Sequence, residues 1–230
     1  MAVITIDGIR IEPQKGWTIL ETARFLGLDI PTLCDHEGIT SWGGCRLCIV
    51  EIGEHDDAKL VSACTYPAED GLNVRTASKR VIHTRKMILE LLIARCPTSK
   101  VLQDLAVKLG LEQVRFTPRW DKCIYCGLCV RICEEQMMAS AIGFIHRGNK
   151  LKIHTPFDIT SEVCRRCGAC IYICPACTLR CEGPQPATVL CGRCENSLQP
   201  TCIETTDDYN CWMGMKGECG TCVTLDKTNK

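Results

Sequence analysis

Alternating apolar and polar residues at the amino-terminal end predict a small α+β domain. Two short apolar segments, residues 3–6 and 9–11, flank Asp7-Gly8, a strong signal for a two-residue hairpin turn. A capping-box pattern begins at Thr18, and apolar residues follow it at helical spacing until Gly27, which suits a helix C-cap. Further strands are expected at residues 48–52, 60–62 and 72–74.

The middle of the chain has the pattern of two helices. Apolar residues recur at helical spacing through residues 77–95, and Pro97 stops the first helix. Ser99 can cap a second helix that runs to residue 108 and ends at Gly110. The apolar residues expected broadly on one side of the first helix are Val81, Ile82, Ile88, Leu89 and Leu92. This segment is interpreted mainly as scaffold.

Two cysteine-rich repeats occupy residues 120–181, with a predicted hairpin between them that turns at Gly148-Asn149. Its strands are expected at residues 142–145 and 151–153. After Cys181 the chain has little apolar periodicity, so bound metal would have to organise it. These changes in pattern divide the chain into four expected parts: residues 1–76, 77–119, 120–181 and 182–230.

The charge balance and the apolar stretches limit the classes of partner. Lys plus Arg total 27 and Asp plus Glu total 27, whereas nucleic-acid binders normally carry a basic excess. We therefore expect no nucleic-acid partner. The first ten residues lack a basic region followed by an apolar core, and no apolar stretch approaches the roughly 20 residues that span a bilayer. We expect a cytoplasmic chain without direct membrane insertion, with a peripheral place on a membrane complex left open.

The 21 cysteines are the dominant feature of the composition. So many cysteines in one chain indicate either a disulfide scaffold or metal ligation. The odd number, the length and the absence of a secretion signal argue against disulfides, and the thiols cluster as C-x-x-C pairs. Metal ligation is therefore the interpretation that we adopt.

A four-cysteine spacing occurs twice, and its repetition predicts two [4Fe–4S] clusters. A run of three thiolates wraps one corner of a cubane, while the fourth cysteine of each run reaches the neighbouring cluster. The first predicted ligand set is Cys123, Cys126, Cys129 and Cys174. The second is Cys164, Cys167, Cys170 and Cys133. Gly127 and Gly168 are expected where the backbone passes close to inorganic sulfide. Paired zinc knuckles are the alternative interpretation.

A third constellation, Cys34-x10-Cys45-x2-Cys48-x15-Cys64, predicts a [2Fe–2S] site. Gly43-Gly44 allows a tight loop that aims backbone N–H groups at sulfur. A four-thiolate zinc site could use the same spacing, but a position after a hairpin and a helix favours [2Fe–2S].

The carboxyl-terminal part holds eight further cysteines, enough for one or two more Fe–S or zinc sites, with Fe–S preferred. They are Cys177, Cys181, Cys191, Cys194, Cys202, Cys211, Cys219 and Cys222. Their connectivity cannot be derived from the sequence. Two C-G-x-C pairs within this set resemble the knuckles of a zinc ribbon or a rubredoxin-like site.

Residues 1–180 resemble the NADH-dehydrogenase large iron–sulfur subunit, together with iron-only hydrogenases and the diaphorase subunits of NAD-linked hydrogenases. The resemblance is carried by the cysteine spacings, by the stretch CIYCGLCVRICEEQ that starts at Cys123, and by AIGFIHRG from Ala141. It implies a plant-type ferredoxin-like (β-grasp) domain, a helical linker, a bacterial-type double-cluster ferredoxin domain and a metal-organised Cys-rich tail.

The resemblance also implies a function and a set of partners. The chain is expected to pass electrons between a flavin/NAD(P)-binding subunit and a hydrogenase, formate dehydrogenase or similar redox subunit, with ferredoxin as a further candidate partner. No G-x-G-x-x-G or P-loop pattern is present, so nucleotide and flavin are expected on other subunits. We assign no catalytic residue to this chain.

The chain departs from that family in one stretch. Most members carry His-x3-Cys-x2-Cys-x5-Cys between the two ferredoxin-like regions, where this chain has only Cys96. One thiol cannot hold the corresponding [4Fe–4S] cluster, so we predict its absence and interpret Cys96 as a buried core thiol. The loss points to specialised relatives, such as electron-bifurcating hydrogenases, formate dehydrogenases or transhydrogenases.

Two other functional classes remain as alternatives. A zinc-organised scaffold would assemble partners without redox work, and such a protein would be colourless. A catalytic subunit with its own metal in the tail would turn over a substrate when isolated.

Overall fold

The computed structural model describes residues 2–53, 57–119, 121, 123–159 and 161–176. The chain divides into two compact units, and each is described by itself. The first unit comprises Met1–Ala94 with Leu105–Thr117, and the second comprises Arg95–Asp104 with Pro118–Lys230. The segment predicted as a linker thus contributes to both units. None of the described helices has the length and apolar character needed to cross a membrane.

A five-stranded mixed sheet forms the centre of the first unit, in the order β2-β1-β5-β3-β4. The strands are β1 (Ile4–Ile6), β2 (Ile9–Ile11), β3 (Ile49–Ile52), β4 (Lys59–Ser62) and β5 (Asn73–Arg75). The pair β1 and β5 is parallel, and every other pair in this sheet is antiparallel. The predicted strands at 48–52, 60–62 and 72–74 agree with β3, β4 and β5 to within a residue or two, so the α+β prediction is confirmed.

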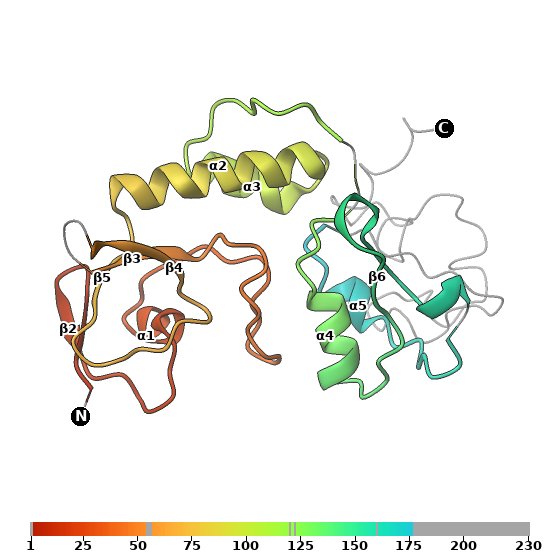
Figure 1. Cartoon of the computed structure of the whole chain (residues 1–230), viewed down its shortest axis with the longest axis horizontal. Coiled ribbons are helices and arrows are strands. Elements are labelled where there is room, and N and C mark those ends of the chain that lie inside the picture. Colours follow the sequence, from red (N-terminus) through yellow and green to blue (C-terminus); the bar gives the residue numbers. More distant parts are fainter. Residues whose placement is uncertain (1, 54–56, 120, 122, 160, 177–230) are drawn as a thin grey trace, which may run out of the picture. The chain divides into compact units, whose positions relative to one another are not determined.

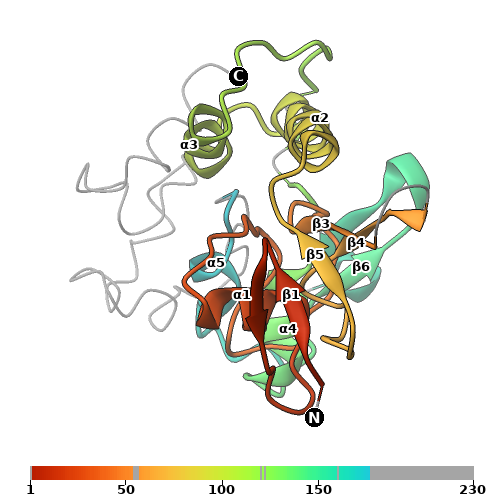
Figure 2. The same cartoon turned by 90° about the vertical axis from the view of Figure 1, so that its left-hand side faces the viewer.

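Two helices cover the two faces of this sheet. Helix α1 (Ile19–Phe25) lies against one face, and α2 (Lys79–Arg95) crosses the other (Figures 1 and 2). The core lies between the sheet and α1, where Ile6 and Val74 pack with Ile19. All three side chains are fully buried, which supplies the hydrophobic stabilisation of this unit.

Local chemistry explains the turn and the helix start that the sequence predicts. Asp7 and Gly8 both have positive φ, 48° and 86°, as a type I′ hairpin turn requires. At the start of α1, the Glu21 N–H donates to Thr18 Oγ1 over 3.3 Å, and the Glu21 carboxylate accepts from the Thr18 N–H over 2.7 Å. The capping box is therefore present as predicted.

Helices α2 and α3 (Lys100–Lys108) lie where the sequence predicts them. Ser99 caps α3 by accepting the Leu102 N–H over 3.4 Å. The expected apolar side of α2 is partly wrong, because Ile82 is 40% exposed. The buried face of α2 consists of Val81, Arg85, Leu89, Glu90 and Ala94. An arginine and a glutamate therefore lie on the buried face of this helix, between apolar residues.

The second unit contains two short helices that the sequence pattern did not predict. Helices α4 (Leu128–Glu135) and α5 (Ala169–Tyr172) pack against each other, and each starts after a left-handed glycine, Gly127 or Gly168 (Figure 1). The predicted hairpin is confirmed as β6 (Gly143–Ile145) paired with β7 (Lys152–His154). Between the strands a 3₁₀ turn spans Gly148–Lys150, and another follows β7 at Pro156–Asp158. The predicted Cys-rich tail, residues 182–230, lies outside the described residues.

The capping box allows a direct test of the first unit. Thr18→Ala removes the side-chain acceptor at the start of α1, and we expect a loss of about 1 kcal/mol in the free energy of unfolding. Denaturant titration of the full chain, followed by far-UV circular dichroism, measures it. Thr84→Ala is the matched control, because its hydroxyl bonds the Arg80 carbonyl within α2 and caps no helix end. An equal loss in the two variants would contradict the role of the cap.

Candidate metal centres

The first unit gathers four buried cysteines at one end of its sheet. Cys48 directly precedes β3 and Cys64 follows β4, and the register that pairs Ile49 with Ser62 brings them together. Their sulfur atoms lie 3.3 Å apart. The four predicted ligands are all at most 4% exposed: Cys34, Cys45, Cys48 and Cys64. Segments that are well separated in the sequence thus share one site.

The loop before β3 turns its backbone towards sulfur. Gly43 and Arg46 take positive φ values of 69° and 60°, and the Cys45 N–H donates to Cys34 Sγ over 3.3 Å. A side chain at position 43 would be strained by this φ and would bring its Cβ to 3.3 Å from Thr65 Cγ2. Inward-facing N–H groups stabilise the negative charge of thiolates or of a cluster that they hold.

The same four thiols divide into two pairs that share protons. The hydrogen bond with Cys45, followed by burial, raises the pKa of Cys34, and that with Cys48 raises the pKa of Cys64 in the same way. In return the pKa of Cys45 and the pKa of Cys48 are each lowered to about 7. Cys45 and Cys48 therefore ionise more readily than an ordinary thiol. Metal binding would release the remaining protons.

The second unit brings Cys174 to the first run of cysteines. Cys126 and Cys129 are buried, and the Tyr125 N–H donates to Cys123 Sγ over 3.3 Å. Burial is the main cause that raises the pKa of Cys129, and the charge of Cys174 is the next, ahead of its own neighbours in the run. Cys174 thus lies near Cys129, as do Cys126 and Cys123, and so does Cys170 of the second run. The division of these cysteines between two clusters stays a prediction.

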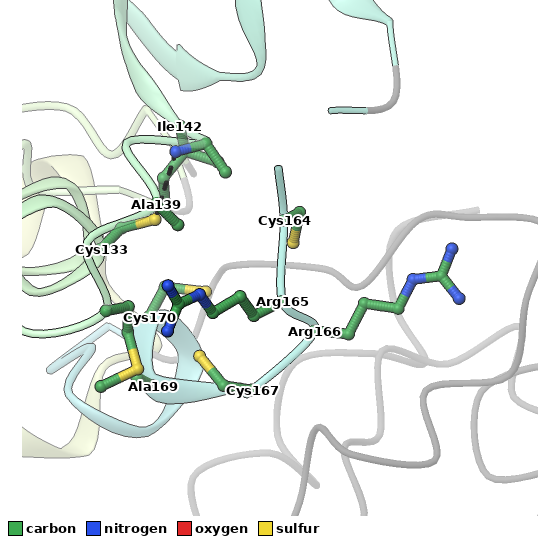
Figure 3. Close-up of a pocket in the computed structure, with 12 residues that line it drawn as sticks. Cys133, Ala139, Ile142, Cys164, Arg165, Arg166, Cys167, Ala169 and Cys170 are labelled. Carbon is green, nitrogen blue, oxygen red and sulfur yellow. Dashed lines mark hydrogen bonds between the residues drawn. The ribbon is translucent and has the colours of Figure 1, made fainter. Parts of the chain in front are cut away.

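The second run of cysteines faces Cys133, which comes from α4. Cys133, Cys164, Cys167 and Cys170 line one pocket, together with small apolar residues such as Ala139 and Ala169 (Figure 3). Burial raises the pKa of Cys170 to about 12, and the charges of Cys133, Cys167 and Cys164 add to it. In Figure 3 the side chain of Arg165 runs across this pocket, while that of Arg166 points away from it.

The two runs adopt the same local backbone. The residue before the second cysteine has positive φ in both, 51° at Tyr125 and 52° at Arg166, and the glycine after that cysteine is left-handed in both. Gly127 and Gly168 have φ values of 72° and 73°, which glycine adopts without strain. That the backbone passes close to inorganic sulfide at these positions stays a prediction. In the described part of the chain, no three His, Cys, Asp or Glu side chains converge as ligands of a single ion would. Donor sets of four thiols with N–H groups aimed at sulfur fit Fe–S clusters.

Cys96 is fully buried, as predicted for a core thiol. Burial raises its pKa to about 12, and the charges of Cys123 and Cys174 are the next causes. Its neighbour Ser99 donates a hydrogen bond to the Pro175 carbonyl over 3.1 Å. Cys96 thus lies near Cys123 and Cys174 but is no member of a predicted four-thiol set.

Two arginines beside these sites were missed by sequence reasoning. The Arg95 guanidinium lies 4.2 Å from the centre of the Tyr125 ring, and its Nε is 3.2 Å from Asp121 Oδ2. Arg85 is buried and donates to the carbonyl of Ile49, the residue that follows Cys48. The sequence did hold a signal for Arg85: at helical spacing it lies between Val81 and Leu89, on the side of the helix that is expected to be apolar.

The tail cysteines cannot be placed. The described residues end at 176, so all eight lie outside them: Cys177, Cys181, Cys191, Cys194, Cys202, Cys211, Cys219 and Cys222. The number, metal and connectivity of sites in the tail stay predictions from the sequence.

If the fourth cysteine of each run binds the cluster of the other run, the number of irons lost in a double variant can be predicted. We expect the double variant Cys126→Ala/Cys174→Ala to lose about four irons relative to the unchanged chain, because both residues would hold the same [4Fe–4S] cluster. Cys126→Ala/Cys133→Ala should lose about eight, because its two residues would hold different clusters. Iron analysis of anaerobically purified protein distinguishes them. Each variant removes two thiols, so equal iron losses would contradict the exchange.

Comparisons with known proteins agree with this geometry. The family "2Fe-2S iron-sulfur cluster binding domain" matches residues 1–79, and "4Fe-4S binding domain" matches residues 117–137. The first match contains the four cysteines of the first unit, and the second contains the run that starts at Cys123.

Relatives extend the likeness over most of the chain. A subunit of an NADH-quinone oxidoreductase of Rhizobium meliloti is 32% identical over 76% of this chain and 23% of its own length. The NADPH-Fe(3+) oxidoreductase subunit alpha of Geobacter sulfurreducens is 33% identical over 78% of this chain and 24% of its own. This chain therefore spans about a quarter of the length of these relatives.

A solved structure extends the likeness to the fold. A chain of the NAD+-reducing [NiFe]-hydrogenase in the H2-reduced state matches with a TM-score of 0.60 and 29% identity, over 67% of this chain and 75% of that one. Together with the two domain matches, these findings make the chain a homologue of an NADH-quinone oxidoreductase subunit, of the NADPH-Fe(3+) oxidoreductase alpha subunit and of a chain of the NAD+-reducing hydrogenase.

Proposed function

We propose that this chain is an electron-transfer subunit that relays electrons through Fe–S clusters within an NAD(P)-linked oxidoreductase complex. The observation that supports the proposal most is the proximity of cysteines from separate segments: Cys34 with Cys45, Cys48 with Cys64, Cys129 with Cys174, and Cys133 with the run that starts at Cys164. The matches to 2Fe-2S and 4Fe-4S binding domains support the kind of cluster at two of the proposed sites.

The ligand sets are proposed from the cysteine spacing, and these proximities support them. We assign a [2Fe–2S] cluster to the set in the first unit, and one [4Fe–4S] cluster to each set in the second unit. Each such cluster accepts one electron, at a potential set by charge, hydrogen bonds to sulfur and solvent access. The protein supplies all three: inward N–H groups, buried thiols and nearby arginines. Its first two sets are largely buried, whereas Cys164 and Cys167 of the third are exposed.

The partners are proposed from the same evidence. The sequence contains neither a G-x-G-x-x-G nor a P-loop pattern, so a flavin/NAD(P)-binding subunit would deliver or collect electron pairs. A hydrogenase, formate dehydrogenase or similar redox subunit would be the other end of the relay; a hydrogenase is the case supported by the likeness to a chain of the NAD+-reducing hydrogenase. Ferredoxin is a further proposed partner in an electron-bifurcating complex.

A specialised complex is favoured over a respiratory one by the stretch around Cys96. That thiol is buried and has no companion cysteines within α2 or α3, so the additional His-ligated cluster has no ligand set there. We further propose one or two Fe–S or zinc sites in the tail. We also propose a cytoplasmic location, because so many free thiols persist in a reducing compartment.

Metal analysis tests the proposal. The chain is purified anaerobically, iron, sulfide and zinc are measured, and EPR spectra are recorded across a reductive titration. We expect about ten irons from one [2Fe–2S] and two [4Fe–4S] clusters, and brown protein that bleaches on reduction. Iron near ten with added zinc would make the tail a structural site, and about twelve to fourteen irons would add the tail to the relay.

The contrary results are equally concrete. Colourless protein with several zinc ions and little iron would replace the relay by a zinc-organised scaffold. Substrate turnover by the isolated chain would instead make it a catalytic subunit.

A further inference from the structure

Arg85 is a buried cation in the first unit. Arg85 is only 5% exposed, although an arginine side chain is almost never buried without a partner. The side chain reaches from α2 to β3, where Nε and Nη2 both donate to the Ile49 carbonyl, over 3.1 Å and 2.6 Å. A single carbonyl oxygen carries only a partial charge, so this contact leaves the full positive charge without a counter-ion.

No carboxylate in the described part of the chain lies within 4.0 Å of this guanidinium, the limit for an ion pair. The buried carboxylates of the unit are occupied by other arginines: Asp35 by Arg24, Glu51 by Arg75 and Arg80, and Glu90 by Arg115. Removing an unpaired charge from water is costly, so an opposite charge is expected near Arg85.

The [2Fe–2S] site lies in the right place to supply that charge. Ile49, whose carbonyl holds the guanidinium, directly follows the thiol ligand Cys48. Burial lowers the pKa of Arg85, and of the charges that oppose this effect, Cys48 is the strongest, ahead of Asp7 and Asp29. Cys48 is itself buried, so its charge acts through a medium of low dielectric constant, where screening by water and salt is weak.

We propose that Arg85 is the built-in counter-charge of the [2Fe–2S] site and raises its reduction potential. This inference rests on the proposed function, because it requires a cluster on Cys34, Cys45, Cys48 and Cys64. A [2Fe–2S] cluster held by these thiols would become more negative by one charge when an external donor such as dithionite gives it one electron. A fixed cation beside it attracts the reduced form more strongly than the oxidised form.

A purely structural role is the competing explanation. In that case the guanidinium only links α2 to β3 by its hydrogen bonds to the Ile49 carbonyl. Replacing it would then lower stability but leave the potential unchanged. The two explanations therefore differ in a redox measurement rather than in a measurement of folding.

The decisive experiment is an EPR-monitored redox titration of the full-length, anaerobically purified chain, with dithionite as reductant. Arg85→Gln removes the charge and keeps an N–H donor for the Ile49 carbonyl. At the midpoint potential of the unchanged protein, we expect its ratio of reduced to oxidised [2Fe–2S] cluster to fall at least tenfold. That ratio corresponds to a shift of about 59 mV to more negative potential for one electron. Arg85→Lys keeps the charge, and its ratio should change much less.

Arg80→Gln is the matched control on the same helix. It also removes one positive charge, but its side chain is 56% exposed and its charge is screened by water. We expect the ratio of reduced to oxidised [2Fe–2S] cluster in Arg80→Gln to change less than twofold. The potentials of the two [4Fe–4S] clusters in each preparation serve as an internal reference.

Each outcome has a defined meaning. If Arg85→Gln retains the cluster and has the same reduction potential as Arg80→Gln, the counter-charge role is wrong. Arg85 then only stabilises the packing of α2 on β3. If Arg85→Gln loses the cluster, the Arg85→Lys variant decides. A cluster retained in Arg85→Lys supports the need for a positive charge, and a cluster lost there as well overturns the counter-charge role. If the unchanged protein has no [2Fe–2S] signal, the proposed function fails, which is a separate result.

Discussion

Holding several anionic sulfur sites inside a small protein is the constraint on which the rest of this structure depends. Thiolates are poorly tolerated away from water unless positive charge, hydrogen-bond donors or metal compensates them. The raised pKa of Cys129 and of Cys170 is caused first by burial and then by neighbouring thiols. The fold therefore has to bring donors towards sulfur, and both units do so with loops and short helices rather than with long elements.

Left-handed backbone positions are the common solution. In the first unit Arg46 follows the first cysteine of its C-x-x-C pair and has a φ of 60°. In the second unit Tyr125 and Arg166 directly precede the second cysteine of their pairs, with φ of 51° and 52°. A positive φ turns the chain back on itself within a C-x-x-C pair, so that successive N–H groups face inward. Non-glycine residues adopt a positive φ at a cost, which the rest of each loop has to offset.

Arginine provides the second kind of compensation, and it acts differently in the two units. Arg85 places an unpaired charge against the peptide that follows Cys48. Arg95 instead stacks on Tyr125 and pairs with Asp121, so its charge is largely balanced within the second unit. Two arginines of helix α2 thus give two cysteine sites different electrostatic surroundings. Different surroundings produce different reduction potentials, and electrons move along a relay from lower to higher potential.

The sequence by itself determined the features that depend on near neighbours. The hairpin at Asp7-Gly8 and the capping box at Thr18 follow from residues a few positions apart, and the C-x-x-C spacings indicate metal ligation. Only the tertiary structure decided that β1 pairs in parallel with β5, that α4 and α5 pack together, and that Arg85 is buried. Each of these depends on contacts between distant segments, and packing of the whole unit decides them. Helical spacing puts position 85 in line with Val81 and Leu89, but the strand that Arg85 meets is decided by packing.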